Sequence, residues 1–145
     1  MRRSWMLIVP AVVVWLLAFV MVGRADVGAA QGRGGGWNIP ATARTETSPL
    51  KVDDTVIASG KKLFSSKCQR CHGASGKGDG PDGDPAHADD MNLTNPARAQ
   101  ANPDGIVFYK IWNGRSSPKM PTFSEEISKE QAWTIVAYVQ TLRAK

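Results

Sequence analysis

Cys68-Gln69-Arg70-Cys71-His72 is the stretch of sequence that decides the fold. Two cysteines separated by two residues and followed directly by a histidine form the pattern at which a c-type haem is attached. The spacing suits this chemistry, because each thiol adds across one vinyl group and both sulfurs reach the same edge of the porphyrin. His72 then lies under the iron, where a neutral imidazole can be a ligand. We therefore predict one haem c, attached through Cys68 and Cys71.

Other chemistries of a Cys-x-x-Cys pair fit this chain less well. A structural zinc site needs two further nitrogen or sulfur ligands, and the one other histidine besides His72 is His87. A thioredoxin-like redox pair is expected in a βαβ setting and leaves His72 without a role. Zinc binding and dithiol chemistry, a structural disulfide included, are therefore the alternatives to haem attachment.

Length and composition agree with a small globular domain. The chain has 145 residues, enough for one domain, and its hydrophobic content of 42% is too high for a disordered chain. A domain of about 95 residues has a modest core, so a bound prosthetic group would be part of the fold. The formal net charge is +5, but the basic residues are scattered, without a basic helix or interleaved aromatic residues. This pattern excludes nucleic-acid binding.

The beginning of the chain predicts export or membrane anchoring. Met1-Arg2-Arg3 is basic, and the twenty residues from Ser4 to Gly23 carry no charge. A helix of that length, at ~1.5 Å per residue, reaches about 30 Å, the thickness of the hydrocarbon core of a bilayer. The apolar region of a signal peptide is usually about 7–15 residues long, which favours an uncleaved anchor. A signal peptide cleaved near Gly28-Ala29-Ala30 is the alternative, and both place the remaining chain outside the cytoplasm.

The following segment is predicted to be a flexible linker. It has few large apolar residues, and the glycine-rich run from Gln31 to Gly36 is typical of a tether. Trp37 and Ile39 interrupt this composition. Their side chains either dock on the domain, dock on a partner, or remain an exposed pair.

Two long helices are predicted at the two ends of the remaining chain. The first spans Asp53–Lys67, with acidic residues that can cap its start, and has Ile57, Gly60 and Phe64 on one face. The last begins at the capping-box pattern of Ser128 to Gln131 and runs to about Leu142. Its apolar residues at helical spacing are Ala132, Ile135, Val136, Val139 and Leu142.

The middle of the chain is predicted to be mostly irregular. Residues 73–103 are rich in Gly, Pro, Asp and Asn and lack periodicity, which indicates a loop. Its acidic residues do not match the spacing of a twelve-residue calcium loop, so we interpret them as a solvated surface. A third helix is predicted to begin at Asn102-Pro103, with Asn102 as N-cap, and to end at Asn113-Gly114.

Three further stretches follow the Cys68-to-His72 motif in a characteristic order. They are a glycine-rich run from Gly73 to Pro81, the tripeptide Lys119-Met120-Pro121, and a closing helix from Trp133 to Leu142. From about residue 52 to residue 142 the chain resembles a class I monohaem cytochrome c of the short bacterial kind.

The resemblance implies an all-α fold whose helices wrap around one covalently bound haem. We therefore expect three parts in the chain. Residues 1–24 form a signal peptide or transmembrane anchor, residues 25–51 form the linker, and residues 52–145 form the cytochrome c domain.

The resemblance also implies the ligands of the haem iron. The family places its second axial ligand in the loop that contains Met120, so His72 and Met120 are the expected pair. A thioether is a soft, neutral ligand that stabilises ferrous iron relative to ferric iron. Met91 and His87 are the rival candidates for the second position.

Supporting residues follow from the same resemblance. In the family, a proline carbonyl accepts the Nδ1 proton of the proximal histidine and fixes its tautomer. Pro81 is the expected acceptor here, and Pro85 is the alternative. The other expected pocket residues are Ile106, Ile111 and Pro121, and the expected residues of the crossing between the first and last helices are Gly60, Phe64 and Trp133.

The implied function is that of an electron carrier rather than an enzyme. We expect single-electron transfer outside the cytoplasmic membrane of a bacterium, in the periplasm, as part of a respiratory chain. The partners are redox proteins and, through the N-terminal segment, the membrane, with no small-molecule substrate. A c-haem subunit of a larger membrane oxidoreductase, one with a purely structural haem, and a haem enzyme or gas sensor with an open distal site are the alternatives. The lysines are either a steering surface for an acidic partner or a solvated surface; they are Lys61, Lys62, Lys67, Lys77, Lys110 and Lys119.

Overall fold

The computed structural model describes residues 36–143, and within this range the fold is helical without a β-strand. The predicted apolar helix and the first part of the predicted linker lie outside the described residues. None of the helices within the described range has the length and apolar character needed to cross a bilayer. The elements in chain order are η1 (Ala41–Arg44), α1 (Asp54–Lys67), α2 (Gln69–His72), η2 (Pro85–His87), α3 (Ala88–Met91), α4 (Pro96–Ala101), α5 (Asp104–Asn113) and α6 (Lys129–Arg143).

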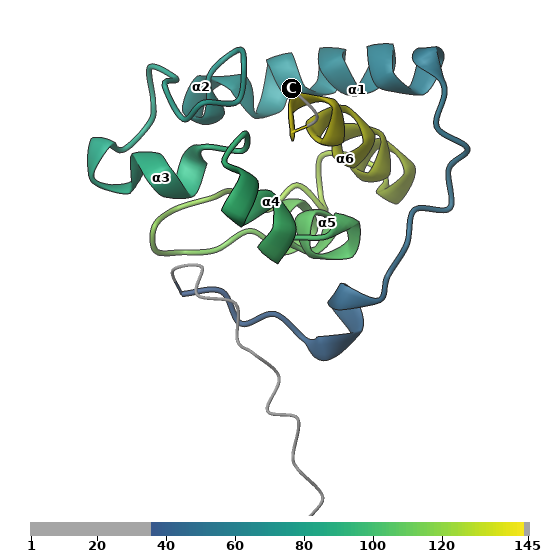
Figure 1. Ribbon diagram of the computed structural model, residues 1–145, viewed down its shortest axis with the longest axis horizontal. Coiled ribbons are helices and arrows are strands. Elements are labelled where there is room, and N and C mark those ends of the chain that lie inside the picture. The colour runs from purple at the N-terminus through teal and green to yellow at the C-terminus, as the bar shows by residue number, and fades with distance from the viewer. Residues whose placement is uncertain (1–35, 144–145) are drawn as a thin grey trace, which may run out of the picture.

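Helices α1 and α6 pack across each other and form the frame of the domain (Figure 1). Asp53 caps α1 by accepting a hydrogen bond from the N–H of Val56 at 2.9 Å. Gly60 lies at the crossing, where a Cβ atom would overlap the carbonyl oxygen of Thr134. One turn later, Phe64 is 1% exposed and packs on the ring of Tyr138, with 5.3 Å between the centroids.

Trp133, which the sequence predicts at this crossing, packs on α5. Its indole stacks on the ring of Phe108, with 4.4 Å between the centroids and 11° between the planes. Phe108 also stacks on Trp112. Trp133 therefore joins α6 to α5, because it lies on a different side of α6 from the Thr134 and Tyr138 positions that meet α1.

The start of α6 has the capping box that the sequence predicts. The N–H of Gln131 donates to Ser128 Oγ at 3.1 Å, and the N–H of Ser128 donates to Gln131 Oε1 at 2.8 Å. The start of α5 differs from the prediction, because the helix begins at Asp104 and Asn102 is instead the C-cap residue of α4. Helix α4 has its own N-cap residue, Asn95, and the residue directly before α5 is Pro103.

The region from residue 73 to residue 103 is more ordered than the predicted loop. It contains η2, α3 and α4, each less than two turns long. Asp84 accepts from the N–H of Ala86 and caps η2. The N–H of Leu93 donates to the carbonyl of Gly76 at 2.7 Å and ties the region together. Elements this short show no periodicity, so the sequence does not reveal them.

Residues 36–50, which we call the strap, pack against α5 instead of forming a free linker (Figure 1). Ala43 is 2% exposed. A Cβ atom at Gly105 would overlap the carbonyl oxygen of Ala43, so the strap backbone lies directly on α5. The hydroxyl of Tyr109 also donates to the carbonyl of Asn38 at 3.0 Å. The C-terminal half of the predicted linker is therefore part of the folded domain.

Candidate functional site

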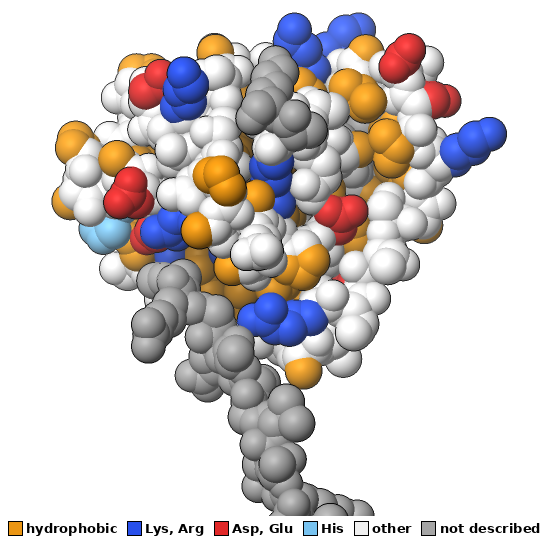
Figure 2. Space-filling view, in the orientation of Figure 1, with side chains coloured by type: hydrophobic (Ala, Val, Ile, Leu, Met, Phe, Trp, Pro, Cys, Tyr) orange, Lys and Arg blue, Asp and Glu red, His pale blue; other side chains and the backbone are white. Residues whose placement is uncertain are grey.

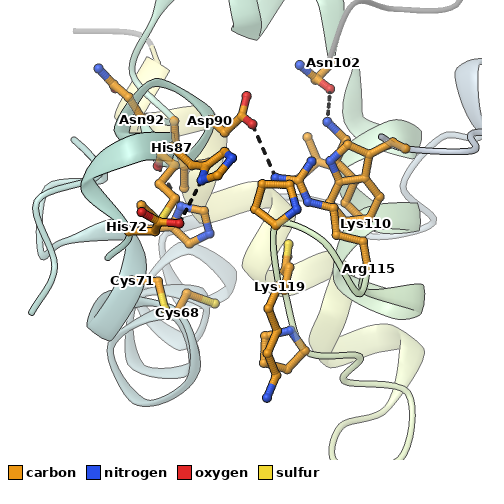
Figure 3. A pocket seen from close by; sticks show the side chains of 18 of the residues that line it. Cys68, Cys71, His72, His87, Asp90, Asn92, Asn102, Lys110, Arg115 and Lys119 are labelled. Carbon is orange, nitrogen blue, oxygen red and sulfur yellow. Dashed lines mark hydrogen bonds and ion pairs between the residues drawn. The ribbon is translucent and has the colours of Figure 1, made fainter. Parts of the chain in front are cut away.

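A cavity of about 310 Å³ brings the sequence-predicted ligands together. Cys68, Cys71, His72 and Met120 all line it, as does Pro121. The two cysteines and the histidine come from the end of α1 and the single turn of α2, whereas Met120 comes from the loop between α5 and α6. Figure 3 shows Cys68, Cys71 and His72 on one side of this cavity.

The cysteines are held by one helical turn. The N–H groups of Cys71 and His72 both donate to the carbonyl of Cys68, at 3.2 and 3.0 Å. Both thiols are free of disulfide bonds. Burial raises the pKa of Cys68 to about 12, with a smaller contribution from Cys71, so this sulfur is a protonated thiol at neutral pH. A thiol is the species that adds across a vinyl group.

His72 is held in the tautomer that a metal ligand needs. Its Nδ1 lies 2.7 Å from the carbonyl oxygen of Met91. Because a carbonyl only accepts hydrogen bonds, Nδ1 carries the proton and Nε2 keeps its lone pair. Burial lowers the pKa of His72, against the opposing effect of the Met91 carbonyl, and favours the neutral ring. The acceptor is thus Met91 rather than Pro81 or Pro85, because the fold brings α3 and not the preceding loop beside the imidazole.

Met120 is positioned by a short backbone bridge. The residue pairs with Arg115 across a tight loop. The loop follows Gly114, which has a φ of +61° that favours glycine. Of the rivals, Met91 lies on the His72 side, where its carbonyl accepts the imidazole proton, and His87 pairs with Asp84 at 2.8 Å. Both rivals line the cavity, but Met120 is the one that approaches from the α5–α6 loop.

Two of the predicted pocket residues lie elsewhere. Ile106 and Ile111 are 1% and 4% exposed, and neither lines this cavity. Val107 lines it instead, together with Phe123 and Leu93. Val107 follows Ile106 by one residue, which corresponds to about 100° around the axis of α5. The sequence could not fix this rotation, because residues 105–108 are all buried.

The far side of the cavity is cationic, which sequence reasoning did not predict. Lys110 and Arg115 lie across the cavity from the cysteines (Figure 3). Arg98 and Arg143 line the cavity as well. Asp90 pairs with Arg98 at 2.7 Å and with Arg115 at 3.5 Å. These residues are far apart in the sequence, so no local pattern could reveal the cluster.

The cationic side chains of this cluster repel one another. Burial lowers the pKa of Lys110 to about 8, and repulsion from Arg115, Arg98 and Arg143 adds to this shift, while Asp90 opposes it. Such a shift means that the protein disfavours another positive charge at this place. The cluster therefore suits an anionic group.

The residues of the cavity fit a haem c. The porphyrin carries its vinyl groups at one edge and two carboxylate-bearing propionates at the opposite edge. Two thiols on one side and a cationic cluster on the other match this arrangement (Figure 3). An imidazole with a free Nε2 and a thioether supply the nitrogen and sulfur that haem iron accepts.

Comparisons with known proteins give two positive findings. The family model for cytochrome c matches residues 57–143. Among solved structures, a chain of the reducing HAO-like protein complex of Kuenenia stuttgartiensis is similar, with a TM-score of 0.55 and 27% sequence identity. The similarity covers 66% of this chain and 47% of that chain, so this chain spans about half the length of that relative. No curated protein sequence matches.

Proposed function

Because this chain belongs to the cytochrome c family, we propose that it transfers single electrons outside the cytoplasmic membrane through a haem c with His72 and Met120 as axial ligands. Membership of the family gives a covalently attached haem c and the role of an electron carrier. The ligand pair, the attachment residues, the location and a respiratory role are our proposal. The observation that carries it is that Cys68, Cys71, His72 and Met120 line one cavity.

The residues of the cavity have distinct tasks in this proposal. Cys68 and Cys71 would each add an S–H bond across a vinyl group, so that a carbon–sulfur and a carbon–hydrogen bond would hold the haem in place. The bound haem c supplies an iron that takes up and releases one electron. His72 offers its Nε2, and the carbonyl of Met91 keeps the proton on Nδ1. Met120 would offer a neutral thioether, which would favour ferrous iron.

The proposed location rests on the apolar segment that precedes the domain. Residues 4–23 carry no charge and are long enough to anchor the domain or to direct its export. We propose redox proteins as partners there. On the face shown in Figure 2, Lys and Arg side chains are spread among hydrophobic and acidic ones, which supports a mixed docking surface rather than a strongly basic one.

A second candidate is a c-haem subunit of a larger oxidoreductase. The observation that favours it is the solved relative, which is a chain of a protein complex. The cavity and its ligands serve both candidates equally. Only the way in which the electron reaches and leaves the domain differs between them.

The proposal can be tested on the full-length protein, produced in a bacterium together with a haem-maturation system. Membrane and periplasmic fractions are probed for covalently bound haem, and each is titrated redox-potentiometrically and exposed to carbon monoxide. A one-electron reversible transition outside the cytoplasm, with no carbon monoxide adduct of the ferrous form, supports the carrier. Rapid formation of that adduct would contradict it and indicate an open distal site. A haem-bearing band that migrates with other proteins in a native gel would select the complex subunit.

A further inference from the structure

The strap places Trp37 at the cationic end of the cavity. Trp37 is half-buried and lines the cavity itself. The Nζ of Lys110 lies 5.2 Å from the centroid of its ring, and the Cζ of Arg115 lies 4.8 Å from it. Both distances are within the range of cation–π attraction. One aromatic ring therefore contacts two cations that come from different elements, α5 and the α5–α6 loop.

The position of Trp37 is set by the packing of the strap on α5. Asn38, its neighbour, accepts a hydrogen bond from the hydroxyl of Tyr109 at 3.0 Å. Ala43 is buried against the glycine at position 105. The backbone around Gly36, with a φ of +71°, turns near the carbonyl of Ser117 in the loop before Met120. Contacts of the strap residues before and after Trp37 thus fix the position of the indole.

The surroundings of Lys110 offer its ammonium group few stabilising interactions besides this ring. Its Nζ donates to Asn102 Oδ1 at 2.5 Å, while burial and three neighbouring guanidinium groups disfavour its charge. The face of an indole carries negative electrostatic potential and attracts a cation. Trp37 therefore offsets part of the repulsion between Lys110 and Arg115, which Asp90 also offsets.

Cations at this end of the cavity change the equilibrium between the two iron states. A nearby positive charge favours the reduced form, because that form carries one positive charge fewer. Water at the same place favours the oxidised form, because water screens and solvates charge better than protein does. A side chain that holds cations in place and also takes the space of water therefore favours the reduced form for both reasons.

We propose that Trp37 is a positioning residue for the haem, which holds Lys110 and Arg115 at the propionate end of the cavity, covers that end, and so raises the reduction potential. This inference rests on the proposed function, since it requires a haem in the cavity with its propionates at the cationic end. The strap is then an N-terminal part of the redox site and not only a connection to the preceding segment.

The test is a double-mutant cycle on the full-length haem protein, read by spectroelectrochemistry. The variants are Trp37→Ala, Lys110→Gln and the two combined, with Trp37→Phe as a conservative variant. We expect Trp37→Ala to lower the potential, Trp37→Phe to lower it less, and the shift from Trp37→Ala to shrink in the Lys110→Gln background. A purely structural role of Trp37 gives equal shifts in both backgrounds, and that result would overturn the proposal.

Controls separate this proposal from the proposed function. Thr47→Ala alters an exposed residue of the same strap that lines neither this cavity nor the neighbouring one, so its potential should equal that of the wild type. If Trp37→Ala does not accumulate, Trp37→Leu fills the space without an aromatic face and replaces it in the cycle. A wild-type protein without covalent haem contradicts the proposed function. A haem-bearing Trp37→Ala protein with unchanged potential contradicts the positioning role alone.

Discussion

The backbones of Arg115 and Met120 pair with each other in both directions. The N–H of Arg115 donates to the carbonyl of Met120 at 2.8 Å, and the N–H of Met120 donates to the carbonyl of Arg115 at 2.9 Å. One bridge thus positions the candidate sulfur ligand and a cation of the cluster on the far side of the cavity. A disturbance of this loop should therefore affect the sulfur and the charge cluster together.

Gly114→Ala tests this coupling. A Cβ atom at Gly114 would lie 2.6 Å from the carbonyl oxygen of Met120, and the φ of +61° disfavours other residues. We expect a loss of about 1–3 kcal/mol of unfolding free energy and a weaker sulfur-to-iron absorption band in the ferric protein. Denaturant unfolding and far-red spectroscopy measure the two effects. Ser116→Ala, at an exposed position of the same loop, should change neither, and loss of stability with an undiminished band would contradict the coupling.

Gly60→Ala tests the crossing of α1 and α6. The added methyl group would overlap the carbonyl oxygen of Thr134 and crowd Tyr138, so the helices must separate. Overpacking of this kind costs about 1–3 kcal/mol, which thermal or denaturant unfolding of the haem protein would measure. The matched control is Ser59→Ala on the exposed side of the same helix. Equal stability of the two variants would show that the helices do not cross closely at this position.

The first and last long helices, α1 and α6, could be predicted because the residues that cap them lie close to them in the sequence. Asp53 directly precedes α1 and accepts from the N–H three residues later, and Ser128 and Gln131 cap the start of α6 through two reciprocal hydrogen bonds. Both helices are also long enough to show periodicity. In contrast, α3 and α4 are short, and the hydrogen bond between Leu93 and Gly76 that holds their region joins residues seventeen positions apart.

The candidate site was predictable only where spacing carries the chemistry. Cys68, Cys71 and His72 are recognised from five consecutive residues, and Met120 from its place in the chain order. The acceptor for His72, the cationic cluster and the contact of Trp37 all depend on residues that meet only after folding. Predicting these three contacts from the sequence would require the orientations of α3, α5 and the strap in the folded domain.

The pH dependence of the reduction potential tests the cationic end of the cavity. The pKa of Lys110 is lowered to about 8, below its ordinary value of 10.5. The folded chain therefore binds this proton less tightly than the unfolded chain. Its positive charge costs stability below pH 8, and this cost is relieved as the pH rises from about 8 towards 10.5. The propionates that we propose beside Lys110 favour its charged form, so the haem protein should lose this proton above pH 8.

Loss of that proton removes a positive charge beside the haem, so the potential should fall as the pH rises through the Lys110 pKa. Potentiometric titration between about pH 7 and pH 11, a range that spans lysine ionisation, measures this step. Lys110→Gln should lack it, whereas Lys62→Gln, at an exposed position of α1, should retain it. A step of unchanged size in Lys110→Gln would place the titrating group elsewhere.

The sulfur ligand is the most direct test of the central claim. The ferric full-length protein is examined for the weak far-red band that reports a thioether bound to haem iron, in the wild type and in the Met120→Ala and Met91→Ala variants. We predict that the band is present in the wild type, lost in Met120→Ala and retained in Met91→Ala, because the backbone carbonyl of Met91 still accepts the His72 proton in that variant. A band that survives in Met120→Ala, or that is absent from the wild type, would contradict the account.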